Sequence, residues 1–144
     1  MLEDKVAIIT GGTRGIGLET AKLFKENKAK VIIFGSKKES IDTAILKLKE
    51  ENIEVEGYYP DLNNYEEIEK IINEIYENYG RIDILVNNAG MSANKKIEET
   101  SSEEFSKIMN LNVDAIFNVT KAVVPYMKEK YLGKSLKKGG VKNA

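Results

Sequence analysis

Short apolar runs alternate with longer segments of helical period along residues 5–86. Most of these runs are continuous and rich in β-branched residues, which is typical of strands buried on both faces of a sheet. The expected strands are residues 5–10, 30–34, 53–59 and 82–86, and the expected helices are residues 15–26, 40–51 and 65–79. Strands that alternate with helices predict a parallel sheet with helices on both faces, connected by right-handed crossovers.

A fourth helical pattern follows the last of these strands, after a polar loop. It covers residues 102–130 as one long apolar pattern. Ser101 or Ser102 is the expected N-cap, with Glu104 as its capping-box partner. Pro125 lies inside the pattern, where it is expected to kink or end the helix.

The first expected strand runs into a glycine-rich loop that opens the first helix. Residues 10–17 read Thr-Gly-Gly-Thr-Arg-Gly-Ile-Gly, with the spacing Gly-x-x-x-Gly-x-Gly. Glycines let a backbone approach a phosphate closely, and a helix N-terminus offers unpaired N–H groups and a positive dipole end. The loop fits a structural turn or a phosphate-binding loop, and the strand–loop–helix context favours the second.

Composition excludes several kinds of chemistry. A chain of 144 residues with 42% apolar and 31% charged residues suits one ordinary domain. The net charge of −1 gives no general attraction to nucleic acid or to an anionic membrane. There is no cysteine and no histidine, so we expect no metal site, and catalysis must use other side chains or a cofactor. No signal peptide or membrane-spanning run is found, which predicts a cytoplasmic protein.

Four motifs resemble the classical short-chain dehydrogenase/reductase family over residues 3–130. Residues 10–17 resemble its cofactor loop, and Asp61-Leu62 resembles its adenine-contacting pair. The Asn-Asn-Ala-Gly at residues 87–90 resembles its signature after the fourth strand, and Asn112 falls at its catalytic-site asparagine. Within the family, the sequence is most similar to 3-oxoacyl-[acyl-carrier-protein] reductases and to sugar-alcohol dehydrogenases of the glucose/ribitol type.

The resemblance implies a Rossmann-like, doubly wound α/β sheet in the strand order 3-2-1-4. It also implies an oxidoreductase that interconverts carbonyl and hydroxyl groups with a nicotinamide cofactor. The expected cofactor-binding residues are Gly11, Gly12, Thr13, Arg14, Gly15, Ile16, Gly17, Ser36, Lys37, Asp61, Leu62, Asn87, Asn88, Ala89 and Gly90.

Several of these polar residues also suit structural roles. Asp61 fits a turn after a proline, and that role is compatible with binding adenine. Asn87 and Asn88 can hold neighbouring loops as well as they can contact a cofactor. In the family the residue at Asn112 stabilises a local kink and holds a water in the proton relay, whereas the alternative is a buried asparagine satisfied by the backbone.

The end of the second strand points to NADP(H) rather than NAD(H). NAD-binding loops place an acidic residue there to hold the ribose 2′-hydroxyl. Gly35 occupies this position and is followed by Ser36, Lys37 and Lys38. Arg14 in the glycine loop adds a further cation, and an arginine there accompanies NADP in the family. The two lysines also suit ordinary surface charge beside a helix.

The rest of the family's catalytic set has no match. Counting from Asn112 places the family's serine near Gly140, where no apolar strand precedes it. Tyr126 and Lys130 have the Tyr-x-x-x-Lys spacing, but they lie on the long helix, 14 residues after Asn112. We interpret them as a helix-end tyrosine and a surface lysine. The chain therefore resembles a nucleotide-binding half-domain, residues 1–130, truncated after the fourth strand and the long helix.

The C-terminal residues 131–144 carry lysines and glycines, no acidic residue and no regular period. They predict a disordered basic tail, with binding of an anionic partner as the alternative.

Self-association is expected from two features. The strand at residues 82–86 has an uncovered edge, and apolar residues lie on more than one face of helix 102–130. Three functions stay open: an NADP-dependent oxidoreductase, a non-catalytic nucleotide-binding half-domain that acts by association, and a remnant without function.

Overall fold

Four parallel strands form the centre of the molecule. The computed structural model describes residues 1–90 and 95–132, and for residues 130–132 it describes the backbone alone. The sheet order is β3-β2-β1-β4, which confirms the predicted order 3-2-1-4. In the register, Ala7 of β1 lies between Val31 of β2 and Ile84 of β4. The elements are β1 (Val6–Thr10), α1 (Gly15–Glu26), β2 (Lys30–Phe34), α2 (Lys38–Glu50), β3 (Glu56–Tyr58), α3 (Tyr65–Tyr79), β4 (Ile84–Val86), the 3₁₀ turn η1 (Ile97–Glu99), α4 (Ser102–Met109), the π-helical turn η2 (Asn110–Asp114) and α5 (Ala115–Leu132).

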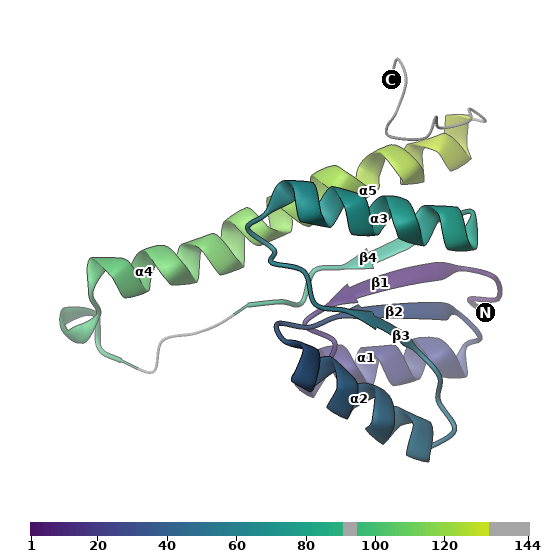
Figure 1. Cartoon of the computed structure of the whole chain (residues 1–144), viewed down its shortest axis with the longest axis horizontal. Coiled ribbons are helices and arrows are strands. Elements are labelled where there is room, and N and C mark those ends of the chain that lie inside the picture. Colours follow the sequence, from purple (N-terminus) through teal and green to yellow (C-terminus); the bar gives the residue numbers. More distant parts are fainter. Residues whose placement is uncertain (91–94, 133–144) are drawn as a thin grey trace.

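Helices cover both faces of the sheet, as the continuous apolar strands predict. Figure 1 shows α1 and α2 on one face and α3 and α5 on the other. The α1–α2 face buries Ile9, Ala21, Ala29, Val31, Ile33, Ile41 and Ala44. The α3–α5 face buries Val6, Ile8, Ile32, Phe34, Ile68, Ile72, Ile75, Ile82, Val119, Ala122, Val123 and Tyr126. The architecture is therefore a Rossmann-like α/β fold with a core on each side of the sheet.

Two strands are shorter than predicted. β3 covers only residues 56–58 of the expected 53–59. β4 begins at Ile84 rather than at residue 82. Before Ile84, the carboxylate of Asp83 takes the place of a backbone carbonyl in the hydrogen bonding to β1. The backbone N–H of Val6 donates to the carboxylate of Asp83 at 2.9 Å, and the N–H of Asp83 donates to the carbonyl of Val6 at 2.9 Å. Asp83 also binds Arg81 through its carboxylate.

The prediction of one continuous α-helix over residues 102–130 is wrong at Asn110–Asp114, where the backbone forms a π-helical turn. The turn η2 separates α4 from α5, and Figure 1 shows α4 extending away from the sheet. Pro125 lies within α5 and does not end it. The neighbouring residues Ala122, Val123 and Tyr126 are buried against the core, and this packing offsets the cost of the proline.

The start of α4 confirms part of the predicted capping. The hydroxyl of Ser101 accepts the N–H of Glu104 at 3.0 Å, so Ser101 is the N-cap. The side chain of Glu104 binds Lys95 rather than closing a capping box.

Most of the predicted tail lies outside the described residues, although the backbone of α5 continues to Leu132. Among the residues that the structure describes, no helix is both long and apolar enough to cross a bilayer.

Candidate functional site

The glycine loop between β1 and α1 requires glycine by its backbone conformation at some positions and by close neighbouring atoms at others. Gly11 and Gly15 have φ values of +64° and +57°, a region that favours glycine. A Cβ on Gly17 would lie 2.1 Å from the carbonyl oxygen of Gly11. A Cβ on Gly12 would lie 2.7 Å from the side chain of Ile33. These glycines bring the loop against the sheet.

The N-terminus of α1 faces open space above this loop. A Cβ on Gly15 would meet no atom within 4 Å. The helix begins at Gly15 without a side-chain cap, and its first turn carries no acidic residue. Its first N–H groups and the positive end of its dipole therefore suit an anion such as a pyrophosphate.

Thr10 joins this loop to the segment after β4. Its buried hydroxyl accepts the N–H groups of Asn88 and Ala89 at 3.0 and 2.9 Å. The side-chain amide of Asn88 donates to the carbonyl of Gly11 at 3.1 Å. The amide of Asn87 points elsewhere and donates to Thr120 of α5 at 3.2 Å. Both asparagines thus hold neighbouring elements, the structural alternative that the sequence left open.

The end of β2 brings cationic and hydroxyl side chains to the opening of the same loop. Ser36 and Lys37 are exposed there and line the same crevice as Arg14. A Cβ on Gly35 would lie 2.7 Å from the methyl group of Thr13, so the position leaves little room for a carboxylate. Lys38 instead binds Asp42 of its own helix at 2.7 Å, and this contact raises its pKa.

The end of β3 forms a turn at residues 61–64. The N–H of Asn63 donates to the carboxylate of Asp61 at 2.9 Å, and the N–H of Asn64 donates to the Asp61 carbonyl at 2.9 Å. From α5, the side-chain amide of Asn118 donates to the carbonyl of Leu62 at 3.0 Å. The Asp61 carboxylate therefore combines a turn role with a position beside the crevice.

These loops enclose a crevice of about 840 Å³ at the carboxyl ends of the strands. Parallel α/β sheets bind ligands at this edge. The crevice brings together most of the predicted residues, namely Gly11, Thr13, Arg14, Gly15, Ile16, Ser36, Lys37, Asp61, Leu62, Asn88, Ala89 and Gly90. Gly12, Gly17 and Asn87 do not line it.

Other lining residues were not predicted from the sequence. Phe34, Gly35, Ser40, Tyr59, Pro60, Asn63, Glu67 and Leu111 complete the wall. Thr10 and Asn118 support the wall from behind without lining it. A polar residue that ends an otherwise apolar strand was the available signal for Thr10, whereas nothing local marks Asn118.

Asn112 lies within the π-helical turn η2. A Cβ on Gly90 would lie 2.9 Å from its side-chain oxygen, so Asn112 approaches the end of the Asn-Asn-Ala-Gly segment. Its neighbour Leu111 lines the crevice, and Asn112 does not. Single π turns inside helices are frequent at functional sites.

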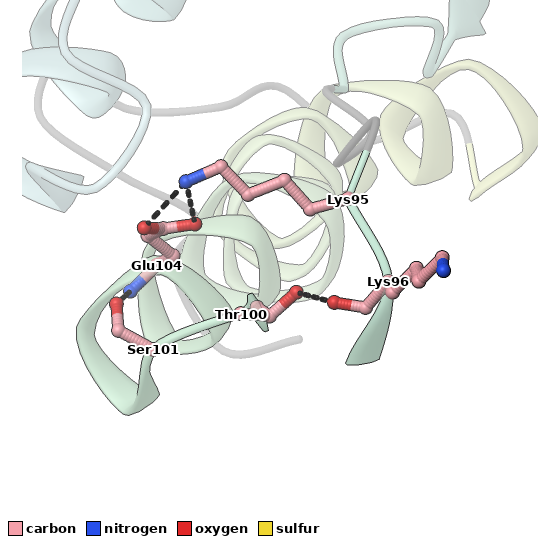
Figure 2. Close-up of polar contacts among 5 residues, drawn as sticks. All are labelled: Lys95, Lys96, Thr100, Ser101 and Glu104. Carbon is pink, nitrogen blue, oxygen red and sulfur yellow. Dashed lines mark hydrogen bonds and ion pairs between the residues drawn. The ribbon is translucent and has the colours of Figure 1, made fainter. Parts of the chain in front are cut away.

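Polar contacts also fix the segment that leads into α4. Figure 2 shows the ammonium group of Lys95 against the carboxylate of Glu104, at 3.0 and 3.1 Å from its two oxygens. The hydroxyl of Thr100 donates to the carbonyl of Lys96 at 3.0 Å. These contacts hold residues 95–101 on the first turn of α4.

Tyr126 is buried between α3 and α5, away from the crevice wall. Its hydroxyl donates to Asn73 at 2.9 Å, and its ring lies 4.6 Å from that of Tyr76, measured between centroids. Burial raises the pKa of Tyr126. A tyrosine that acts as acid or base near neutral pH needs a lowered pKa, so this environment supports the structural interpretation.

No group of three or more acidic side chains in the described ranges could hold a metal ion.

The comparisons with known proteins agree with this geometry. The sequence matches the short chain dehydrogenase family over residues 5–136, and the chain belongs to that family. It is 46% identical to a 3α-hydroxysteroid dehydrogenase of Mediterraneibacter gnavus, over 90% of this chain and 52% of the relative. It is 36% identical to the 3-oxoacyl-[acyl-carrier-protein] reductase FabG of Thermotoga maritima, over 88% of this chain and 51% of the relative.

Solved structures give the same result. The crystal structure of 2-keto-3-deoxy-D-gluconate dehydrogenase from Streptococcus agalactiae has a TM-score of 0.78 and 36% identity. The match covers 90% of this chain and 48% of that one. The chain thus spans about half the length of the curated relatives it matches.

Proposed function

We propose that the chain binds a nicotinamide dinucleotide in the crevice at the carboxyl ends of β1, β2, β3 and β4. The observation that carries the proposal is the open space at Gly15. There α1 begins without a side-chain cap, directly after the glycine loop that packs against the sheet. Arg14 and Lys37 at the opening add the positive charge that suits a phosphorylated ligand. The bound cofactor would supply or accept a hydride.

A fluorescence titration with NADPH tests this proposal. Gly15→Asp places a carboxylate where the pyrophosphate would lie; the space there is open, and the strain of a side chain at its positive φ is the same in kind at the control position Gly80. Binding should fall at least 100-fold. Gly80→Asp is the matched control, because Gly80 also has a positive φ, +77°, and open space, at the C-terminus of α3. Equal binding by wild type and Gly15→Asp would refute the proposal.

The preferred cofactor in this proposal is NADP(H). Gly35 leaves no carboxylate to repel a 2′-phosphate, and Ser36, Lys37 and Arg14 can receive it. Replacing Lys37 by alanine should weaken NADPH binding about fivefold and leave NADH binding unchanged. Lys38→Ala is the control, because Lys38 is held by Asp42. Equal wild-type affinities for the two cofactors would contradict the preference.

The activity that we propose for this family member is interconversion of carbonyl and hydroxyl groups, as in ketoreductases. For the 144 residues themselves we expect binding without turnover, since Tyr126 is buried and bound to Asn73. The second candidate function is thus a non-catalytic nucleotide-binding half-domain. Reduction of a carbonyl compound by the purified chain, lost on Tyr126→Phe, would contradict that candidate.

We also propose that copies of the chain associate, and that the protein is cytoplasmic. β4 is an edge strand, and the side chains of Phe105, Val113 and Phe117 are 57%, 50% and 63% exposed. Exposed apolar groups that lie together on one helical segment favour a protein partner.

A further inference from the structure

The turn at residues 61–64 is shaped by its own hydrogen bonds. The two bonds to Asp61, from the N–H groups of Asn63 and Asn64, close the turn locally. Such local bonds define the conformation of a turn, but they do not fix its position relative to the rest of the protein. Contacts from other elements have to do this.

One side chain of α5 makes such a contact. Asn118 donates its side-chain N–H to the carbonyl oxygen of Leu62 at 3.0 Å, across 56 positions of sequence. Asn118 is partly buried, so water competes less for this bond than at an exposed site. One helical turn further on, the ammonium group of Lys121 lies 4.8 Å from the ring centroid of Tyr65, the first residue of α3. Figure 1 shows α5 running beside α3, in agreement with these contacts.

Asn118 does not contact the crevice itself, and it acts on the crevice only through its hydrogen bond to the turn at residues 61–64. Asp61 and Leu62 line the crevice, and Asn118 does not. The Leu62 carbonyl belongs to the peptide that follows Leu62, so its orientation is coupled to the backbone that carries the Asp61 carboxylate. A loss of the Asn118 bond would therefore loosen the groups that face the crevice without removing any of them.

We propose that Asn118 is a positioning residue that holds Asp61 and Leu62 in place for the adenine ring. The inference rests on the proposed function and on the adenine-contacting role that the family resemblance implies for Asp61, whose carboxylate would accept a hydrogen bond from the adenine amino group. By holding the Asp61 carboxylate in place, Asn118 sets how much more tightly the site binds adenine, which has an amino group, than a base that lacks one.

The test compares NADPH with its analogue that carries hypoxanthine in place of adenine, and therefore lacks the amino group. The wild-type chain should bind NADPH about fivefold more tightly, the value of one hydrogen bond. Asn118→Leu keeps the size of the side chain without the donor, and should bind both ligands nearly equally. Asn118→Gln retains an amide donor and should recover part of the preference. Asn78→Leu, an exposed position on α3, is the matched control and should keep the full preference.

Hydrogen exchange in the free protein separates this inference from the proposed function. The N–H groups of Asn63 and Asn64 should exchange faster in Asn118→Leu than in wild type and in Asn78→Leu. Unchanged exchange in Asn118→Leu, or a fivefold preference kept by Asn118→Leu, would overturn the role of Asn118. A wild-type chain that binds neither nucleotide would instead refute the proposed function and with it the adenine role, while exchange still decides whether Asn118 fixes the turn.

Discussion

The two faces of the sheet are packed with different side chains. The buried cluster under α1 and α2 consists of isoleucine, valine and alanine, and among the described residues it contains no titratable group. The cluster under α3 and α5 includes Tyr126 and is bordered by further tyrosines. Tyr79 donates to Glu56 at 2.5 Å, and Tyr76 donates to Glu129. One face therefore depends on apolar burial alone, whereas the other also depends on the protonation of phenols.

The largest expected loss of stability comes from removing a buried isoleucine, and it should be similar on both faces of the sheet. Ile33 on the α1–α2 face and Ile72 on the α3–α5 face are both fully buried. Each isoleucine→alanine substitution should lower the free energy of unfolding by about 2–5 kcal/mol, because it removes buried methyl groups and leaves a cavity. Urea denaturation at pH 7 measures both values. A loss below about 1 kcal/mol for one variant would show that its face is loosely packed.

Alkaline pH should destabilise the α3–α5 face, which contains the tyrosines, more than the α1–α2 face. The bond to Glu129 and burial raise the pKa of Tyr76 to about 12, and burial and the bond to Glu56 raise that of Tyr79 to about 12. The ordinary value is 10, so the unfolded chain loses these protons first as pH rises. The stabilisation is complete below pH 10 and is lost between pH 10 and about 12.

Thermal unfolding measured from pH 8 to pH 12 checks this prediction. The melting temperature should fall above pH 10, and the fall should be smaller in a Tyr76→Phe, Tyr79→Phe double variant. Tyr59→Phe, at an exposed tyrosine, is the control. A decline of the same size in the double variant would assign the alkaline effect to other groups.

A smaller effect is expected from a single hydroxyl on the α3–α5 face. Tyr126→Phe removes the donor to Asn73 and keeps the ring against Tyr76. The expected loss is about 1 kcal/mol, or a melting temperature lower by about 3 °C. Differential scanning calorimetry measures it, and an unchanged melting temperature would show that water replaces the tyrosine hydroxyl.

The smallest effect on stability should come from the outer side of the helical segment. Phe117→Lys should change the free energy of unfolding by less than about 0.5 kcal/mol, because the ring is 63% exposed. The same substitution should weaken the proposed association, as measured by light scattering at micromolar concentration. Leu46→Lys on α2, 62% exposed, is the control on the opposite face. A monomeric wild-type chain would contradict the association.

Patterns within one element predicted more of the fold than of the site. The bounds of β2, α1 and α3 match the structure, because their apolar periods are regular and their ends are marked. The predicted start of β4 and the predicted continuity of helix 102–130 were wrong for reasons that no local pattern carries. Asp83 replaces a strand residue through its side chain, and the π turn inserts an extra residue that an apolar pattern of period 3.6 averages out.

The site shows the same division. Gly11, Gly15 and Asp61 follow from motif and spacing, and the structure brings them to one crevice. Thr10 and Asn118 act through partners 78 and 56 positions away along the chain. Such pairings depend on how the strands and helices meet in space, which the sequence pattern of a single element does not encode.

The π turn at η2 also separates the helical phase of α4 from that of α5. Each residue of an α-helix advances the side chains by about 100° around the axis, and a π turn holds one residue more than the α-helical turn it replaces. If the same residues formed a regular α-helix through Asn110–Asp114, the side chains of α4 would be rotated by about 100° relative to those of α5, whereas deleting one residue would restore an α-helical turn and keep the present phase. The orientation of Phe105 is thus set by the π turn itself, so a change from π to α hydrogen bonding in η2 would redirect the side chains of α4 without altering the residues that α5 buries against the sheet.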